Sequence, residues 1–486
     1  MKTQRLSSLI GKALLQPKVG YVVVLVLTGC ATFDPQAGFP EMSHAVQERS
    51  GMQVVWNPGT ELDAQVAQKV RELLAGQLTV DTAVQVALLN NRDLQSTYAE
   101  LGLAQADLVQ AGLLQNPVFD IGLKFPLSGG ITTLALGTAI DFLDILYLPL
   151  RRRVAAARFE DAKLQVTGAV LDFAAAVQAA FYRHQANEQS LDLFQRIAQG
   201  LALSLDVAQR LHEAGNITDL DVARERALVE EAKLQLAVAE LAVHQSREQL
   251  NILMGLWGEE TAWDMDRRLP DTPAQPIPLE ELERQAIRQS LELASARQQI
   301  IAAGEQAGFT RVTALVPELS LGALAEREGG DEGGAWSVGP SFEVALPLFD
   351  QGRARLGRAY TELRRTQQVY YALGVRIRST VRAVRARVQE TQSRALYYRD
   401  ILLPLRERIV NETQLQYNAM QLGVFHLLQA QEQQIQTAGA YVETLRDYWL
   451  ARTDLGQILS GRLPGSGDVG MDSLRQPTNN AENGRH

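Results

Sequence analysis

The chain repeats itself at an offset close to 200 residues, and this duplication limits the possible folds more than any other feature of the sequence. Five short segments recur in the same order, at offsets that drift between 199 and 208 residues as short insertions would make them drift. We therefore expect one structural unit built twice, as repeat 1 over 61–256 and repeat 2 over 278–461. The matched pairs are Leu78–Ala83 with Ile277–Leu282, Asn116–Phe119 with Val316–Leu319, Arg151 and Arg153 with Arg353 and Arg355, Ala214–Ile217 with Leu422–Phe425, and Leu253–Gly255 with Leu459–Gly461.

Two segments outside the repeats have the composition of connecting chain. Residues 257–277 lie between the repeats and contain three prolines, which predicts a linker. Residues 462–486 are rich in Gly, Pro, Asn and Asp, and we expect them to form a disordered tail.

Each repeat carries a pair of short segments in which apolar and polar side chains alternate with a period of two. These pairs lie within 117–142 and 316–346, and each follows an Asn-Pro or Val-Pro break after a helical pattern such as that of 80–114. The alternation predicts β-hairpins with two chemically different faces. In repeat 2 we expect a hydrophilic loop over 326–334 between the strands. The apolar positions include Phe119, Ile121, Leu123, Leu134, Leu136, Ile140, Leu319, Leu321, Trp336, Val338, Phe342 and Val344.

The same hairpins fit two environments. They could form a soluble sheet with one face on a core, but their length of about 10 residues and their small, polar second face are typical of transmembrane strands around water. Four strands cannot close a barrel, and open sheet edges are not tolerated in lipid. We therefore expect several chains to share one barrel, with twelve strands for three chains.

Long helices follow each hairpin. Residues 151–213 contain no proline, and roughly 60 helical residues span on the order of 90 Å. Gly215-Asn216 predicts a reversal, after which Leu234, Val238 and Leu241 follow coiled-coil spacing. Repeat 2 repeats this pattern from 353 to 421, with its reversal at Gly423. Helices alone would also fit an elongated coiled-coil scaffold without a pore.

The first residues predict export. A basic start with no acidic residue precedes a short apolar run, so residues 1–29 have the pattern of a signal peptide. Leu27-Thr28-Gly29-Cys30 resembles a bacterial lipobox, in which the cysteine is acylated and becomes the first residue, and Cys30 is the only cysteine of the chain. We thus expect residues 30–60 to form a lipidated extension. Ala31-Thr32 lacks the aspartate that often retains lipoproteins in the inner membrane, which favours the outer membrane.

The composition argues against several function classes. Removing residues 1–29 takes away four positive charges and moves the formal charge from −9 to −13, so nucleic acid is not an expected partner. The sequence shows no phosphate-binding loop, zinc-protease motif or nucleophile elbow, and its six histidines follow no metal-ligand spacing. We therefore expect no enzyme, cofactor or metal site, although His212 and His426 both lie near the reversals. An envelope hydrolase is the most distant alternative.

The tandem copy, the proline before each hairpin, the glycine at each reversal and the Leu-x-Gly that closes each copy together resemble the TolC-like outer-membrane efflux family, over about Leu78–Gly461. The resemblance implies an α+β membrane protein: a homotrimer with a twelve-stranded barrel and a long α-helical coiled-coil barrel across the periplasm. It implies a passive duct for small molecules or metal ions, working with a periplasmic adaptor and an inner-membrane pump. The lipidated start is similar to the lipoprotein branch found with drug and heavy-metal exporters. The outlet of a type I protein secretion system is an alternative within the family.

The resemblance also assigns roles near the helix reversals. Gly215, Asn216, Gly423 and Val424 would form the periplasmic tips that dock the adaptor. Thr218 and Asp219 stand where some family members hold the closed state through a polar network, but the arginine that those members carry after the second glycine is missing here. With Asp221, they are the candidate gate and a possible acidic collar selective for cations. The plainer alternative is that Asp219 and Asp221 stabilise the first turn of a helix.

Two arginine clusters follow the predicted hairpins. At these positions they would meet anionic head groups of the outer-membrane lipid, with about 1 kcal/mol for each residue. Ordinary salt bridges between helices are an equally good interpretation. The clusters are Arg151, Arg152 and Arg153 in repeat 1, and Arg353, Arg355 and Arg358 in repeat 2.

Overall fold

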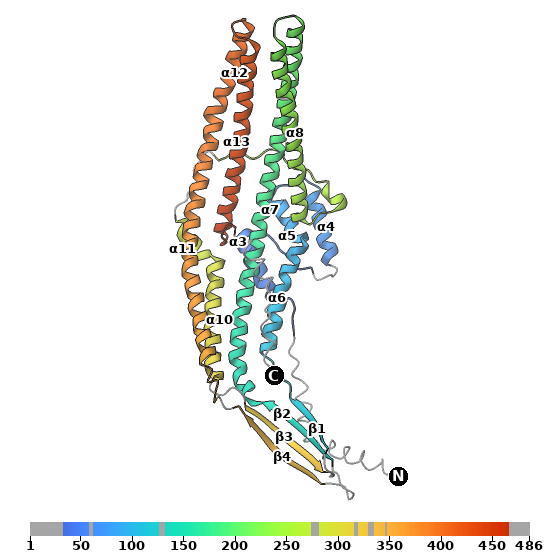
Figure 1. Cartoon of the computed structure of the whole chain (residues 1–486), viewed down its shortest axis with the longest axis vertical. Helices are drawn as coiled ribbons and strands as arrows, with labels where there is room; N and C mark the ends of the chain where they lie inside the picture. Colours follow the sequence, from blue (N-terminus) through green and yellow to red (C-terminus); the bar gives the residue numbers. More distant parts are fainter. Residues whose placement is uncertain are drawn as a thin grey trace, which may run out of the picture. The chain divides into compact units, whose positions relative to one another are not determined.

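The structure is a computed structural model that describes residues 33–57, 62–125, 132–273, 281–314, 319–328, 335–345 and 348–465 (Figure 1). The signal peptide, Cys30, the turn at 126–130, the Val-Pro of the second hairpin, the end of the predicted linker and residues 466–486 lie outside this part. The chain divides into two compact units. Among the described residues, unit one holds 33–37, 101–125, 132–159, 301–314, 319–328, 335–345 and 348–363, and unit two holds the remainder.

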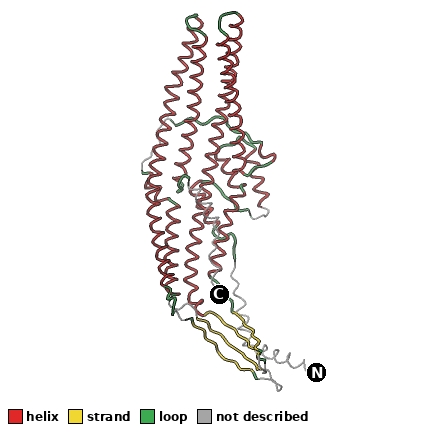
Figure 2. The backbone as a smooth tube through the Cα atoms, in the orientation of Figure 1, coloured by secondary structure: helices red, strands yellow, loops and turns green. Residues whose placement is uncertain are grey.

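Unit one is built on one antiparallel sheet of strands β1 (Val118–Lys124), β2 (Thr133–Asp141), β3 (Leu319–Glu328) and β4 (Trp336–Val344), in the order β1-β2-β3-β4 (Figure 2). The two hairpins, one from each repeat, therefore join side by side through β2 and β3. The pairing sets Leu136 opposite Ile121 and Ala325, and Ala325 opposite Val338. Because the register keeps like residues on like faces, the alternation of each strand extends across the whole sheet.

Strand β3 is longer than the sequence predicted. We expected a hydrophilic loop to begin at Glu326, but residues 326–328 continue the strand and pair with β2. Lys124 Nζ lies 2.9 Å from Glu326 Oε1, across β2 on the same face. Glu326 thus lies on one face of a strand and Arg327 on the other, which a reading of local hydrophilicity could not distinguish from a loop.

Helix α7 (Phe142–Glu213) begins directly after β2, nine residues before the predicted start at 151. The cause is local: the Asp141 side chain accepts a hydrogen bond from the Leu143 backbone N–H at 3.0 Å and the helix starts there. Helix α6 (Arg92–Ala111) ends in unit one, as does α10 (Leu291–Thr313), and α11 (Arg353–Tyr397) begins in it.

Unit two contains the helical hairpins (Figure 1). Long helices make two antiparallel pairs: α7 reverses into α8 (Asp219–Met254), and α11 continues through a π-helical turn, η2 (Tyr398–Leu402), into α12 (Leu403–Asn418), which reverses into α13 (Val424–Leu459). Pro404 explains the interruption at η2, because it lacks the N–H that a regular helix needs there. The shorter elements are α3 (Phe39–Ser50), α4 (Leu62–Leu74), α5 (Val80–Asn90), η1 (Gly258–Thr261) and α9 (Leu282–Gln289).

The two repeats close in the same way. The predicted helix over 80–114 breaks at Asn91, where the Asn90 and Asn91 amides donate to the last carbonyls of α8, including Met254 O at 3.0 Å. Repeat 2 breaks at the matching position between α9 and α10, and Leu291 N–H donates to Gly461 O at 2.9 Å. Both closing glycines, Gly255 and Gly461, have positive φ (66° and 97°) and lie against this break, which explains the Leu-x-Gly motif.

Parts of the segments that we predicted to form a linker and a disordered tail are packed. In the linker, Trp263, Met265 and Leu269 are buried, and Leu78 and Met265 form a β-bridge. The predicted tail begins too early, because Leu463 is also buried and the Arg462 side chain is only 13% exposed. Proline and glycine interrupt regular structure, but they do not prevent the side chains between them from joining a core.

The core of unit two includes a helix stripe of Ile377, Val381, Val384 and Val388 from α11, packed against Tyr448 and its neighbours in α13. Among the described residues, α7 is the one helix long and apolar enough to cross a membrane, with a mean hydropathy of 1.4 in its most apolar window. Half of that window is buried within the chain. This stretch is rich in alanine, and we interpret it as a packed helix face.

Candidate functional site: sheet faces, helical tips and a terminal clasp

The two faces of the sheet differ in chemistry. On one face Phe119, Ile121, Val338 and Phe342 are large, apolar and exposed. The opposite face carries small or polar residues, among them Gly122, Ala135, Gly137, Ser341 and Glu343. An apolar outer face with a small, polar inner face suits a wall between lipid and water. Three residues depart from the pattern. Val118 and Leu324 lie on the small, polar face, with Leu324 Cδ2 3.2 Å from the place that a Cβ on Gly137 would occupy, and Arg327 lies on the apolar face.

The sheet ends in two open edges. Within the described residues, β1 pairs with β2 alone and β4 with β3 alone, so each outer strand keeps a row of free backbone groups. In a bilayer such groups would each cost several kcal/mol. A sheet with these edges would therefore need further strands in a bilayer.

The first tip joins α7 to α8. Gly215 has a φ of 74°, and the backbone N–H groups of Gly215 and Asn216 donate back to His212 O and Leu211 O, both at 2.8 Å. Glycine reaches this left-handed conformation without the steric cost that a Cβ would add. The predicted reversal at Gly215-Asn216 is confirmed by these contacts.

The second tip, between α12 and α13, is built differently from our expectation. We predicted the reversal at Gly423, but this glycine has a φ of −77° and a ψ of 160°, an extended conformation that any residue adopts. The left-handed residue is Met420, with a φ of 56° and a side chain that is 94% exposed. The glycine therefore marks the start of α13, and the reversal itself occurs three residues earlier.

The three candidate gate residues have separate roles in the chain. Thr218 caps α8: its hydroxyl accepts from the Asp221 N–H, and the Asp221 carboxylate accepts from the Thr218 N–H at 3.0 Å. The Thr218 hydroxyl also donates to the Asp221 carboxylate at 2.7 Å, and this bond first, and then the one from the Thr218 N–H, lowers the pKa of Asp221 below its usual value. The Asp221 side chain is only 27% exposed, whereas that of Asp219 is 97% exposed, 3.2 Å from His212 Nε2. Asp221 is thus a capping residue, and Asp219 alone is free to face a passage.

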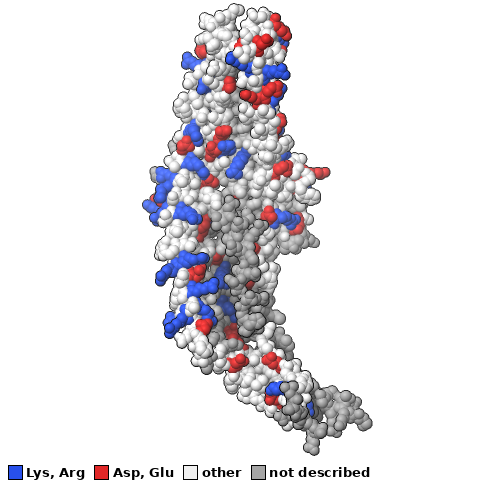
Figure 3. All heavy atoms as spheres, in the orientation of Figure 1, with Lys and Arg blue, Asp and Glu red and all other residues white. Residues whose placement is uncertain are grey.

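The residues of the two arginine clusters also differ in their roles. Arg151 is a structural residue, since its guanidinium pairs with the buried Asp144 and donates to the carbonyls of Ala111 and Leu113, at 3.0 and 2.7 Å. It joins the end of α6 to the start of α7, so we withdraw it as a lipid contact. Arg355 lies 3.6 Å from Asp350. Lipid contacts of Arg152, Arg153, Arg353 and Arg358, all exposed, stay a prediction. Arginines continue along α11 (Figure 3), so basic charge is not confined to these clusters.

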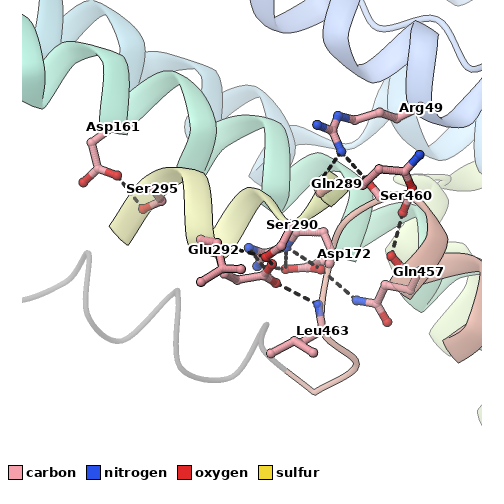
Figure 4. A network of polar contacts seen from close by, with 12 residues as sticks. Arg49, Asp161, Asp172, Gln289, Ser290, Glu292, Ser295, Gln457, Ser460 and Leu463 are labelled. Carbon is pink, nitrogen blue, oxygen red and sulfur yellow. Dashed lines mark hydrogen bonds and ion pairs between the residues drawn. The ribbon is translucent and has the colours of Figure 1, made fainter. Parts of the chain in front are cut away.

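A polar cluster at the end of α13, in which the side chains of Asp172, Glu292 and Arg462 are only 11–13% exposed, was not predicted from the sequence. We call Arg49, Asp172, Glu292 and Arg462 the terminal clasp (Figure 4 draws this network). Arg462 Nε donates to both oxygens of Asp172 at 3.0 Å, and Arg462 Nη1 lies 3.2 Å from Glu292 Oε1. Arg49, from α3, donates to the carbonyls of Gln289 and Ser460.

One glycine could have hinted at the terminal clasp. Gly168 lies inside α7, where glycine costs about 1 kcal/mol relative to alanine. A Cβ there would lie 2.8 Å from Arg462 Nη1, so the glycine leaves room for the guanidinium against the helix. The clasp therefore joins α3, α7, α10 and the chain beyond α13.

The histidines do not form a metal centre. Among the described residues, no three His, Cys, Asp or Glu side chains lie together in a group that could hold a metal ion. His184 is fully buried: its Nδ1 lies 2.8 Å from Ser246 Oγ and its ring meets Trp263 edge-on. Because the Ser246 hydroxyl donates to Val243 O, Nδ1 carries the proton, and burial lowers the pKa of His184 to about 4.

Long paired helices in one unit, and in the other a four-stranded sheet with one apolar and one small, polar face, are the elements expected of an outer-membrane channel. Comparisons with known proteins agree. The family model described as "Outer membrane efflux protein" matches residues 83–256. Cobalt-zinc-cadmium resistance protein CzcC of Cupriavidus metallidurans is 24% identical over 388 residues, 79% of this chain and 90% of its own. Toluene efflux pump outer membrane protein TtgF of Pseudomonas putida is 27% identical, over 66% and 68% of the two chains.

A solved structure of the outer-membrane channel OprN shares the fold, with a TM-score of 0.65 and 19% identity over 85% of this chain and 93% of that one. Residues 83–256 thus match the outer membrane efflux protein family, and the chain has the fold of the OprN channel. Its relatives are channel proteins rather than enzymes. The predicted fold class, long helices with four strands in each chain, is confirmed.

Proposed function

We propose that three copies of this chain form a passive duct that exports small molecules or metal ions, as the outlet of a system completed by a periplasmic adaptor and an inner-membrane pump. The observation that carries the proposal is the sheet. It has one apolar face, one small and polar face, and two open edges within the described residues. Three sheets joined edge to edge would satisfy the backbone groups of β1 and β4 and leave the polar face toward water.

The cargo classes follow from the relatives and from charge. One relative is named for resistance to cobalt, zinc and cadmium and another for toluene efflux, so the proposal includes both metal ions and small organic molecules. On the small, polar face Asp120, Glu326 and Glu343 outnumber Lys124, the one basic residue on that face among the described strand residues whose side chains are placed. An acidic lining favours cations in a narrow passage.

The tips are the proposed docking site for the adaptor. Gly215 and Asn216 at one tip, and Gly423 and Val424 at the other, lie at the ends of helical hairpins (Figure 1). The first tip is acidic through Asp219, and the second exposes Met420 and, in part, Phe425. An adaptor would thus meet one polar and one apolar tip in each chain.

The test begins with the purified protein in detergent. We expect a mass of three chains by native mass spectrometry and stepwise, cation-selective conductance in planar bilayers. In cells that lack the chain, its return should restore tolerance to zinc, cobalt and cadmium, or to toluene. A monomer without conductance would favour the coiled-coil scaffold, and restored protein secretion alone would favour the type I outlet.

The lipid anchor is a separate part of the proposal. Acylated Cys30 would hold the start of the mature chain in the inner leaflet of the outer membrane, and the motivation is Leu27-Thr28-Gly29-Cys30. A palmitate analogue should label the wild-type chain and fail to label Cys30→Ala. Persistent labelling of the variant would remove the anchor. The trimer should form in both, because the strands alone hold the barrel.

A further inference from the structure

Helix α11 carries a dense band of positive charge on an otherwise acidic chain. Residues 376–394 contain six arginines and one acidic residue, Glu390, whereas the chain without residues 1–29 has a formal charge of −13. All six arginines are exposed, and Figure 3 shows basic side chains along the side of the molecule where Figure 1 draws α11. We call them the α11 basic band: Arg376, Arg378, Arg382, Arg385, Arg387 and Arg394.

The duplication of the chain provides an internal comparison. At the offset of 202 that relates Arg151 to Arg353, residues 174–192 of α7 correspond to the band. That stretch has one arginine, Arg183, and two acidic residues, and it carries alanine at three positions where the band has arginine. The pairs are Ala174 with Arg376, Ala176 with Arg378, and Ala180 with Arg382. A long helix therefore forms at this place in the repeat without the charge, so the band is not a requirement of the fold.

Ion pairs within the chain use only half of the band. They join Arg382 Nη1 to Glu283 Oε1 (3.4 Å), Arg387 Nη2 to Asp454 Oδ2, and Arg394 Nε to Glu390 Oε1 (3.3 Å). Within the described part of the chain, Arg376, Arg378 and Arg385 have no ion-pair partner. These three lie within about 14 Å along the helix axis, where their like charges repel one another. A bound anion would remove this repulsion.

The surroundings of the band indicate the chemistry of its partner. Between Val375 and Tyr397, all within the described chain, α11 exposes no large apolar side chain. Surfaces that bind folded proteins are anchored by aromatic and other large side chains, which the band does not offer. Guanidinium groups instead bind carboxylates and phosphates through paired hydrogen bonds. The band therefore suits a flexible polymer that repeats its negative charge.

The length of the band argues against lipid head groups as this partner. Residues 376–394 span about 27 Å of helix. The head-group layer on each side of a bilayer is only about 5–8 Å thick. In the proposed duct the long helices cross the periplasm and stand across any membrane surface, so such a layer would meet only one or two turns of the band. The partner has to be a deeper layer.

We propose that the α11 basic band binds the cell-wall glycan of the envelope through the free carboxylates of its peptide stems. This polymer is the anionic layer that a duct across the periplasm has to pass. Repeated carboxylates on a flexible strand can pair in turn with Arg376, Arg378 and Arg385, and the other three arginines can exchange their exposed partners. The contact would hold the wall against the duct. This inference rests on the proposed duct and adds its attachment to the wall.

Co-sedimentation with purified peptidoglycan sacculi tests the contact, with the purified full chain in detergent and without adaptor. The wild type should pellet with the sacculi at about 50 mM salt, and the bound fraction should fall several-fold at about 300 mM, because the contact is ionic. The triple variant Arg376→Ala, Arg378→Ala and Arg385→Ala should bind several-fold less, whereas the same three changes to Lys should retain most of the binding. Unchanged binding of the alanine variant would overturn the proposal.

A matched control removes the same charge elsewhere. Arg210→Ala, Arg224→Ala and Arg226→Ala, combined in one chain, change three exposed arginines of the α7–α8 hairpin and should leave binding as in the wild type. Equal losses in the two alanine variants would show that net charge, and not the band, governs binding. Native mass spectrometry and helix content by circular dichroism confirm that each variant is folded and assembled.

Two further measurements identify the source of the negative charge. Sacculi whose carboxylates have been amidated should no longer bind the wild type, and undiminished binding would refute the carboxylate contact. Phosphatidylglycerol added to the detergent micelles should not release the bound protein. Full release would assign the band to lipid head groups and refute the wall contact. A conducting trimer that does not sediment with native sacculi would overturn this inference and leave the duct intact, whereas a monomer without conductance would overturn the duct, whether or not it binds sacculi.

Discussion

Single residues determine the backbone conformation of the two tips. Gly215 and Gly423 occupy matching positions in the two repeats, yet only Gly215 has a left-handed backbone. Both have open space where a Cβ would point, so the difference lies in φ alone. An equivalent sequence position therefore does not carry an equivalent conformation.

This difference predicts an asymmetry between two alanine variants. Gly215→Ala should weaken its tip by about 1–2 kcal/mol, because a Cβ is strained at positive φ. Gly423→Ala should be neutral or slightly stabilising, since the unfolded chain loses freedom at a compatible φ. Hydrogen exchange of the tip amides in the intact protein measures both. Equal protection in the two variants would contradict the assignment.

His184 predicts a pH dependence of stability. Its pKa is depressed from 6.5 to about 4 by burial and, secondarily, by Arg247, so in the folded chain it stays neutral where the unfolded chain is protonated. Its stabilisation is therefore complete above about pH 6.5 and is lost as the pH falls toward 4, by at most roughly 3 kcal/mol. Glu188 Oε1, 3.9 Å from Nε2, would partly offset the loss.

The measurement is the urea midpoint for loss of helix in detergent at pH 7 and pH 5. The urea midpoint of the wild type should be lower at pH 5 than at pH 7. The midpoint of His184→Gln should fall less between these pH values, although that variant is less stable at the start. Parallel falls in the two proteins would show that other groups cause the acid sensitivity.

At the scale of elements, the start of α8 separates two acidic residues that the sequence left together. Asp219→Asn should reduce cation selectivity in planar bilayers, with helix stability unchanged, because its side chain is exposed. Asp221→Asn should leave selectivity nearly unchanged and weaken the start of α8, because its carboxylate holds the cap. Since the pKa of Asp221 is lowered, that cap is present at neutral pH and is lost in acid below about pH 4. Unchanged selectivity in Asp219→Asn would remove the acidic collar.

The terminal clasp joins several helices through one guanidinium. Arg462→Met would leave the largely buried carboxylates of Asp172 and Glu292 without their arginine, which costs about 3–5 kcal/mol. Gly168→Ala should destabilise the wild type, where a Cβ meets Arg462. In the Arg462→Met background the same change should stabilise by about 1 kcal/mol, through helix propensity. A double-mutant cycle of melting temperatures checks this reversal of sign, and simple additivity would refute it.

At the scale of the whole molecule, the two faces of the sheet predict opposite effects of the same substitution. Ile121→Arg places a charge on the apolar face, at about 2–4 kcal/mol if it lies at mid-membrane, and should reduce assembly into trimers. Ala135→Arg, on the small, polar face, should assemble normally and lower single-channel conductance. Trimer yield and conductance measure the pair. Normal assembly of Ile121→Arg would place the apolar face away from lipid.

The sequence by itself determined the elements whose cause is local. Period-two alternation placed the strands, as at Phe119 and Ile121, since side chains of a strand alternate between faces whatever surrounds them. The break at Gly215-Asn216 and the duplication could be recognised from the sequence for the same reason. The sequence also located a coiled-coil stripe at Leu234 and Val238, but not what it faces.

Only the tertiary structure decided which partner each side chain meets. Arg151 and Arg462 look like other arginines of the chain, and burial beside Asp144 and Asp172 alone makes them structural. Trp263 stands in a stretch with the composition of a linker, yet it packs in a core. The physical reason is that composition and period act over a few neighbouring residues, whereas burial and ion pairing depend on segments up to 290 residues apart.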